Sequence, residues 1–265
     1  MYCEYWKLKV PPFENVPNPR CVFYSPNHDE SLMRLFYTVK GRKGACMLTG
    51  EVGCGKTTIS NVFKEKLQNG KFDIGMITNP SLSSIELLQE ILYQLGSDVH
   101  YNTKLQLIHA LHNKVMGNLK GGKETIVIID EAHLIKEEET YEELRLLLNL
   151  QDDNRFLLTL ILVGQPELKE LIGKIPQFEQ RIPIKYHLSP LNFIDTFKYM
   201  QFRLKKAGIT KNIFTGDAAK KIYEYSGGIP RKINNICDMS LLAGFIDQAR
   251  VIDHLIIKKV IEDEG

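Results

Sequence analysis

The sequence has 265 residues, enough for one large domain or two modest ones, with 43% hydrophobic and 25% charged residues. This composition is typical of an ordinary globular protein and excludes a largely disordered chain. Thirty-four Lys and Arg residues nearly balance thirty-two Asp and Glu residues. The net charge of +2 therefore argues neither for nor against nucleic acid as a partner.

The five cysteines are scattered without a CxxC pair, a usage typical of reduced thiols in the cytosol rather than of a metal site. They are Cys3, Cys21, Cys46, Cys54 and Cys237. The N-terminal stretch MYCEYWKLKV lacks an apolar signal core, and the most apolar runs, at 157–163 and 241–246, are too short to span a bilayer. We therefore expect a soluble, cytoplasmic chain without a transmembrane segment of its own.

Short apolar runs rich in β-branched residues alternate with longer helical patterns through the first two thirds of the sequence. The predicted strands are 45–49, 72–78, 125–130, 157–163 and 184–188. The predicted helices between them cover about 57–68, 84–95, 103–118 and 138–150. This alternation predicts an α/β fold with a five-stranded parallel sheet between helices.

The pattern changes after Pro190 and is helical to residue 263. The stretch NFIDTFKYMQFRLKKAG predicts a helix that stops at Gly208, and a later helix is expected to begin at Ile229-Pro230. The sequence thus predicts a C-terminal, all-helical lid on the α/β core.

A P-loop pattern, Gly50-x-x-x-x-Gly55-Lys56-Thr57, stands directly after a predicted strand and before a predicted helix. Its glycines let backbone N–H groups converge on phosphate oxygens, and the helix adds the positive end of its dipole. We expect Lys56 to reach the β and γ phosphates and the Thr57 hydroxyl to bind Mg²⁺. The predicted nucleotide-binding residues of this stretch are Gly50, Glu51, Val52, Gly53, Cys54, Gly55, Lys56, Thr57 and Thr58.

A second motif, TIVIIDEAH, places two acids at the end of another core strand. Asp130 is expected to hold the magnesium through its water, and Glu131 to polarise the attacking water. The alternative is a solvated acidic strand end. The letters DEAH also spell a helicase motif, but about seventy-five helical residues cannot supply a second ATPase-like lobe. His133 is therefore interpreted as an incidental polar residue on the rim of the sheet.

Further polar residues lie where a ring-forming ATPase needs them, although each alone is compatible with a solvated side chain. Gln165 follows a strand, so its amide could position the lytic water, and Arg231 begins a lid helix from which it could reach the γ phosphate. Arg181 precedes the last strand and could project to a neighbouring subunit as an arginine finger. Asn79 could hydrogen-bond Glu131 and hold it inactive, or simply form a turn before Pro80.

Together these residues resemble the AAA+ ATPases and, within them, the ExeA (GspA) family of secretion-associated ATPases. The most specific matching segments are LTGEVGCGKTT at 48–58, IIDEAH at 128–133, LVGQPEL at 162–168 and SGGIPRKIN at 226–234. The resemblance implies a P-loop AAA+ core that hydrolyses ATP with Mg²⁺ and forms an ATP-dependent homo-oligomer. It also implies residue roles: Lys56 and Thr57 as the P-loop pair, Asp130 and Glu131 as Walker B acids, Gln165 as sensor 1 and Arg231 as sensor 2.

The resemblance further divides the chain into an N-terminal segment, 1–44, that packs on the nucleotide site, a core, 45–189, and a helical lid, 190–265. Residues 23–28 would lie against the adenine, and Arg145 is the rival of Arg181 as finger. Larger family members continue into a membrane span and a peptidoglycan-binding domain, so an envelope role for this sequence would need a separate membrane or envelope partner protein. The family usually has a small side chain at the position of Cys54 and Gln at that of His133.

Two other functions remain open beside secretion. Short ExeA-like ATPases also resemble transposon-encoded regulators that assemble on DNA and recruit a transposase. Lysines are available for such a role, although a solvated face is the preferred explanation of them. A small-molecule kinase is disfavoured by the pair Asp130 and Glu131. Cys54 has two interpretations as well: a thiol activated by the P-loop amides, or an inert thiol turned into the sheet.

Overall fold

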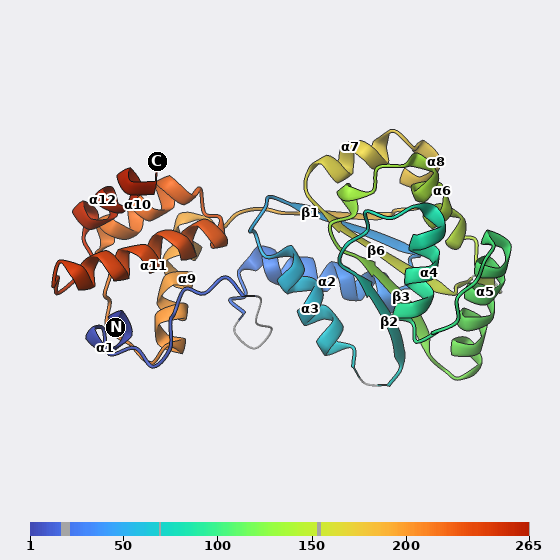
Figure 1. Ribbon diagram of the computed structural model, residues 1–265, viewed down its shortest axis with the longest axis horizontal. Coiled ribbons are helices and arrows are strands. Elements are labelled where there is room, and N and C mark those ends of the chain that lie inside the picture. Colours follow the sequence, from blue (N-terminus) through green and yellow to red (C-terminus); the bar gives the residue numbers. More distant parts are fainter. Residues whose placement is uncertain (17–21, 69, 153–154, 265) are drawn as a thin grey trace. The chain divides into compact units, whose positions relative to one another are not determined.

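The computed structural model describes residues 1–16, 22–68, 70–152 and 155–264, which form two compact units (Figure 1). The α/β unit comprises Pro26–Gly50 and Lys56–Leu188. The helical unit comprises Met1–Ser25, Glu51–Gly55 and Ser189–Gly265. The P-loop stretch 51–55 and the N-terminal stretch therefore have most of their contacts with the C-terminal helices.

The α/β unit is built on one parallel sheet, as the sequence predicts (Figure 1). Its strands are β1 (Ala45–Gly50), β2 (Phe72–Ile77), β3 (Glu124–Ile129), β6 (Leu158–Gly164) and β7 (Ile184–Leu188). The spatial order is β2-β3-β6-β1-β7, and every neighbouring pair is parallel. β1 and β6 are buried along their whole length, which explains their continuous apolar runs.

Helices cover both faces of this sheet. One face carries α2 (Pro26–Lys40) and α3 (Lys56–Lys66). The other carries α4 (Ser84–Gln94), α5 (Lys104–Lys120), α6 (Glu138–Leu147), α7 (Glu167–Gly173) and α8 (Pro176–Glu179). Alternate strand residues such as Ala45 and Met47 join one core with α4 to α8, because successive side chains of a strand point to opposite faces.

Local chemistry explains several element boundaries. Ser83 caps α4 in a capping box with Glu86, and Thr103 caps α5 by accepting from the backbone N–H of Gln106. α6 ends at Leu147 rather than near residue 150. The sequence pattern did not predict α1 (Tyr2–Tyr5), α2, the 3₁₀ turn η1 (Ala132–Leu134), β4 (Gln151–Asp152), β5 (Arg155–Phe156), α7 and α8.

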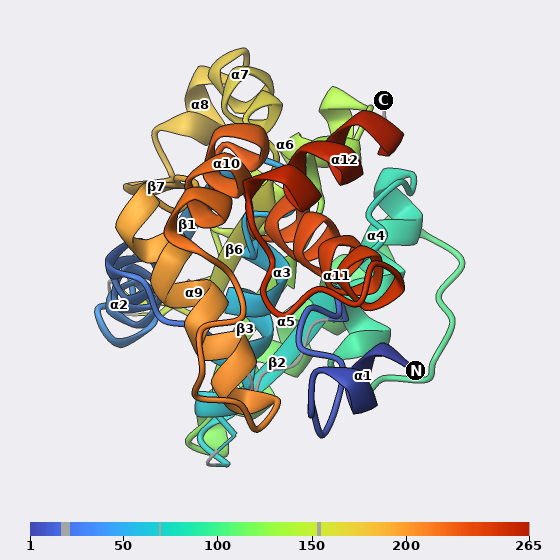
Figure 2. The same ribbon diagram turned by 90° about the vertical axis from the view of Figure 1, so that its left-hand side faces the viewer.

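The helical unit contains α9 (Phe193–Lys206), α10 (Gly216–Ser226), α11 (Pro230–Ile246) and α12 (His254–Glu264), of which α10, α11 and α12 pack on one another (Figure 2). α9 stops before Gly208, whose φ of +95° suits glycine, and α11 begins at Pro230 as predicted. The N-terminal stretch joins this unit: the Trp6 indole N–H donates to the Leu241 carbonyl at 2.8 Å.

Cys3, Cys46, Cys54 and Cys237 are free thiols, and Cys21 lies outside the described residues. Within the described ranges, none of the helices combines the length and the apolar character that crossing a bilayer requires.

Candidate nucleotide-binding site

The P-loop leads from the end of β1 at Gly50 to the start of α3 at Lys56. Gly53 and Gly55 have φ values of +85° and +98°, a region that glycine adopts without strain and other residues avoid. The buried Lys56 ammonium donates to the Gly50 carbonyl at 2.8 Å, so the side chain folds back over its own loop. In the helical unit, the backbone N–H of Arg231 donates to the Gly53 carbonyl at 3.3 Å.

Thr57 and Asp130, far apart in the sequence, meet at the carboxyl end of the sheet. The Thr57 hydroxyl donates to Asp130 Oδ2 at 2.7 Å, and the Glu131 backbone N–H donates to Asp130 Oδ1 at 2.9 Å. The Asp130 side chain is buried, so both of its oxygens are held by short, directed hydrogen bonds. A hydroxyl and a carboxylate are the hard oxygen ligands that Mg²⁺ prefers, and this ion usually takes its remaining ligands from phosphate and water. The pair therefore fits the predicted metal.

The backbone turns sharply at Glu131, two residues after the end of β3. Its φ of +52° lies in the left-handed region, which is uncommon for a residue other than glycine and often marks a functional site. Its side chain is 37% exposed, whereas the neighbouring Asp130 is 2% exposed. The two adjacent acids therefore have different surroundings: Asp130 is fixed inside the site, and Glu131 is accessible to water.

His133 proves to be part of this group, although the sequence analysis treated it as incidental. It lies in η1, its side chain is 10% exposed, and its Nδ1 lies 3.4 Å from Glu131 Oε2. The same Nδ1 accepts a hydrogen bond of 3.3 Å from the backbone N–H of Gln165, directly after β6. β6 lies between β1 and β3 in the sheet, so His133 links the end of this central strand to Glu131. The sequence signal for it was its place in a turn two residues after Glu131.

The predicted arginines and Asn79 differ in their surroundings. Arg145 donates from Nε to Glu142 on its own helix at 2.7 Å. Arg181, between α8 and β7, is partly buried, and its guanidinium forms no hydrogen bond or ion pair with any residue in the described part of the chain. Asn79 is exposed, and no hydrogen bond joins it to Glu131 within the described ranges. Its role as a restraint on Glu131 stays a prediction.

The remaining predicted residues are placed as follows. Glu51 and Val52 are exposed, Thr58 is partly buried on α3, and Arg231 is exposed as the second residue of α11. Cys54 is 1% exposed, which favours the inert thiol over the activated one. In the predicted adenine segment, Phe23 packs in the helical unit against the rings of Tyr199 and Phe202, each with a centroid 5.7 Å away.

A family model described as AAA domain matches residues 15–172, which include the P-loop and the acids at the end of β3. The chain belongs to this family of AAA+ P-loop proteins. It is 40% identical over 259 residues to General secretion pathway protein A of Aeromonas hydrophila, a match that covers 96% of this chain and 47% of that protein. The chain is thus similar to the ExeA/GspA proteins and spans about half the length of this relative.

Solved structures show the same fold at low sequence identity. The Aeropyrum pernix ORC2 protein in its ADPNP-ADP complexes has a TM-score of 0.67 and 18% identity, over 95% of this chain and 71% of that one. The Aeropyrum pernix ORC1 protein in complex with DNA has a TM-score of 0.70 and 12% identity, over 95% and 69%. The RuvB Holliday junction branch migration motor of Thermotoga maritima has a TM-score of 0.60 and 18% identity, over 90% and 69%. These likenesses show an AAA+ fold.

Proposed function

We propose that this chain binds ATP with Mg²⁺, hydrolyses it, and uses the cycle to assemble or regulate a partner complex. The hydrogen bond of 2.7 Å between Thr57 and Asp130 carries the proposal, because it joins the P-loop to the acid of β3 in an AAA domain. A glycine turn followed by Lys and Thr by chance would not be expected to contact a buried carboxylate at the end of β3, which lies two positions from β1 in the sheet.

Binding falls to the P-loop. Its backbone N–H groups and the first turn of α3 attract the phosphates, and the Lys56 ammonium leaves the Gly50 carbonyl for the β and γ phosphate oxygens. Thr57 and Asp130 would hold Mg²⁺, which supplies positive charge against the phosphate oxygens. With the metal bound, the Thr57 hydroxyl would be one of its ligands in place of its present hydrogen bond to Asp130.

Hydrolysis requires a water held in line with the γ phosphate. The Glu131 carboxylate accepts a hydrogen bond from this water and withdraws its proton as the water attacks, while the Gln165 amide orients it. His133 contacts the carboxylate of Glu131 and the backbone of Gln165, so it fixes the distance between the two groups that handle the water. We assign His133 the role of a positioning residue.

The proposal extends to self-association and a partner. Arg181 is the better candidate for a finger offered to a second copy, because Arg145 is already engaged by Glu142. The name of the relative, General secretion pathway protein A, supports a secretion-associated process in which a membrane or envelope protein is the partner. No specific observation favours the transposition alternative.

Two substitutions test the core of this proposal. Lys56→Ala should weaken binding of a fluorescent ATP analogue at least about tenfold, because the lysine contacts phosphate in the ground state. Glu131→Gln should keep binding but slow phosphate release about a hundredfold or more, because the carboxylate matters when water attacks. Lys66→Ala and Glu65→Gln, exposed on α3, are the matched controls. Equal ATP affinity in wild type and Lys56→Ala would overturn the proposal.

A further inference from the structure

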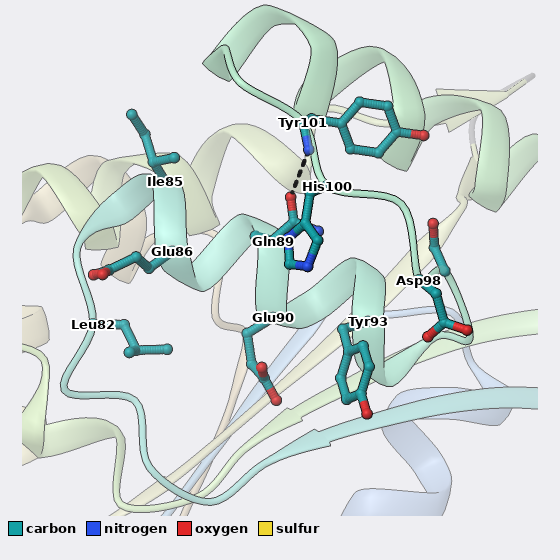
Figure 3. A pocket seen from close by; sticks show the side chains of 10 residues that line it. Leu82, Ile85, Glu86, Gln89, Glu90, Tyr93, Asp98, His100 and Tyr101 are labelled. Carbon is teal, nitrogen blue, oxygen red and sulfur yellow. Dashed lines mark hydrogen bonds between the residues drawn. The ribbon is translucent and has the colours of Figure 1, made fainter.

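A groove on the α/β unit lies outside the nucleotide site. It has a cavity volume of about 660 Å³, within the range of roughly 300–1,000 Å³ typical of ligand pockets. Figure 3 shows its lining side chains, which come from α4 and from the segments just before and after it. They are Leu82, Ile85, Glu86, Gln89, Glu90, Tyr93, Ser97, Asp98, His100 and Tyr101.

α4 has two apolar faces, and only one of them is buried. Leu87, Leu88, Ile91 and Leu92 pack into the core of the α/β unit. On the groove side, Ile85 is 46% exposed and Tyr93 is 57% exposed. These two residues are eight positions apart, so they stand about two turns, or roughly 12 Å, apart along one stripe. Two large apolar side chains spaced along a helix face are the anchors that a second helix can pack on.

The far wall of the groove is fixed by one side chain. The Gln89 amide donates from Nε2 to the Val99 carbonyl at 2.8 Å. Its Oε1 accepts from the Tyr101 backbone N–H at 3.1 Å, the bond that Figure 3 marks. These two hydrogen bonds hold the backbone of the segment 99–101 against α4. The groove is therefore formed before anything binds, which lowers the entropic cost of binding.

The charge of the groove is one-sided. Three carboxylates line it, from Glu86, Glu90 and Asp98, and no lysine or arginine is among the lining residues. Considering only the described residues, none of these carboxylates forms an ion pair. The hydroxyl and the backbone N–H of Ser83 hold the pKa of Glu86 below its ordinary value, so this carboxylate is ionised at neutral pH. The groove thus offers negative charge around an apolar centre.

We propose that this groove docks a basic amphipathic helix of a partner protein. An apolar side chain of that helix packs between Ile85 and Tyr93, and lysines or arginines meet the carboxylates on the rim. Glu86 and Glu90 are four residues apart, one helical turn, so they match cationic side chains spaced i, i+4 on the incoming helix.

The test uses three synthetic, fluorescein-labelled peptides of roughly 18 residues, long enough to form helix, and the full chain without nucleotide. The first has a Leu and Phe stripe flanked by Lys at i, i+4. The second replaces each Lys by Glu, and the third replaces the apolar stripe by Ser. Fluorescence anisotropy should show saturable binding of the first peptide, at least about tenfold tighter than the other two, and weakening with salt. Equal binding of the first and third peptides would mean non-specific charge attraction and would overturn the proposal.

Variants locate the binding. Glu90→Gln with Asp98→Asn should weaken the first peptide about tenfold, and Tyr93→Ala by a similar factor, whereas Glu65→Gln with Glu170→Gln, exposed acids elsewhere on the same unit, should have no effect. Circular dichroism excludes unfolding of the variants. Sedimentation of the protein without peptide measures its self-association. If Glu90→Gln with Asp98→Asn changes this self-association, a second copy of the chain occupies the groove, and the proposal of a partner helix is rejected. Because no nucleotide is present, the result does not depend on ATP hydrolysis.

Discussion

Replacing His133 by alanine should slow hydrolysis without weakening ATP binding. The substitution removes the acceptor of the Gln165 backbone N–H, at 3.3 Å, and the ring that lies 3.4 Å from Glu131 Oε2. One such hydrogen bond contributes about 0.5–1.5 kcal/mol net. If this free energy is lost from the positioning of the attacking water, it corresponds to roughly a 2- to 13-fold lower kcat.

The assay is steady-state phosphate release, combined with the affinity for a fluorescent ATP analogue. His133→Gln is the informative companion, because a glutamine amide can accept from the Gln165 N–H and donate to Glu131 at once. We expect His133→Gln to retain most of the wild-type kcat, His133→Ala to lose it, and both to keep ATP affinity within about twofold. A His133→Ala variant with wild-type kcat, or a His133→Gln variant as slow as His133→Ala, would refute the positioning role.

Two further predictions concern the finger and a core thiol. Arg181→Ala should keep ATP affinity and lower hydrolysis about a hundredfold or more, and adding Glu131→Gln subunits should restore activity, since each subunit donates what the other lacks; rescue of Arg145→Ala instead would reassign the finger. Burial raises the pKa of Cys46 to about 11, so between the ordinary thiol pKa near 8.5 and pH 11 the unfolded chain loses a proton that the folded chain keeps. The free energy of unfolding should therefore fall by on the order of 2 kcal/mol as the pH rises through that window. Urea unfolding measured at several pH values should show a smaller decrease for Cys46→Ala than for the wild type. The same pH dependence in both proteins would count against this explanation.

The sequence predicted β1, β3 and β6 because each is a short, largely apolar run that is buried on both faces. β2 and β7 were predicted from their β-branched and aromatic residues, although they are only partly buried. It missed α2, whose apolar residues are interspersed with Asn, His, Asp and Arg, and β4 and β5, which are two residues long. Elements of that kind depend on contacts with the rest of the fold, and local patterning carries little information about them.

The sequence alone identified the P-loop and the acids Asp130 and Glu131 as candidate site residues, because each motif is a continuous stretch whose expected chemistry follows from residue type and from its place at a strand end. Only the tertiary structure decided which distant groups meet them. It joined Thr57 to Asp130, placed His133 between Glu131 and Gln165, and left the Arg181 guanidinium without a hydrogen-bond partner in the described chain. It also formed the groove on α4, in which exposed apolar side chains lie beside three carboxylates. One wall of this groove is held by the hydrogen bond from Gln89 to the Val99 carbonyl, ten residues further along the chain. Such juxtapositions depend on strand order and on hydrogen bonds between segments, and no local pattern in the sequence specifies them.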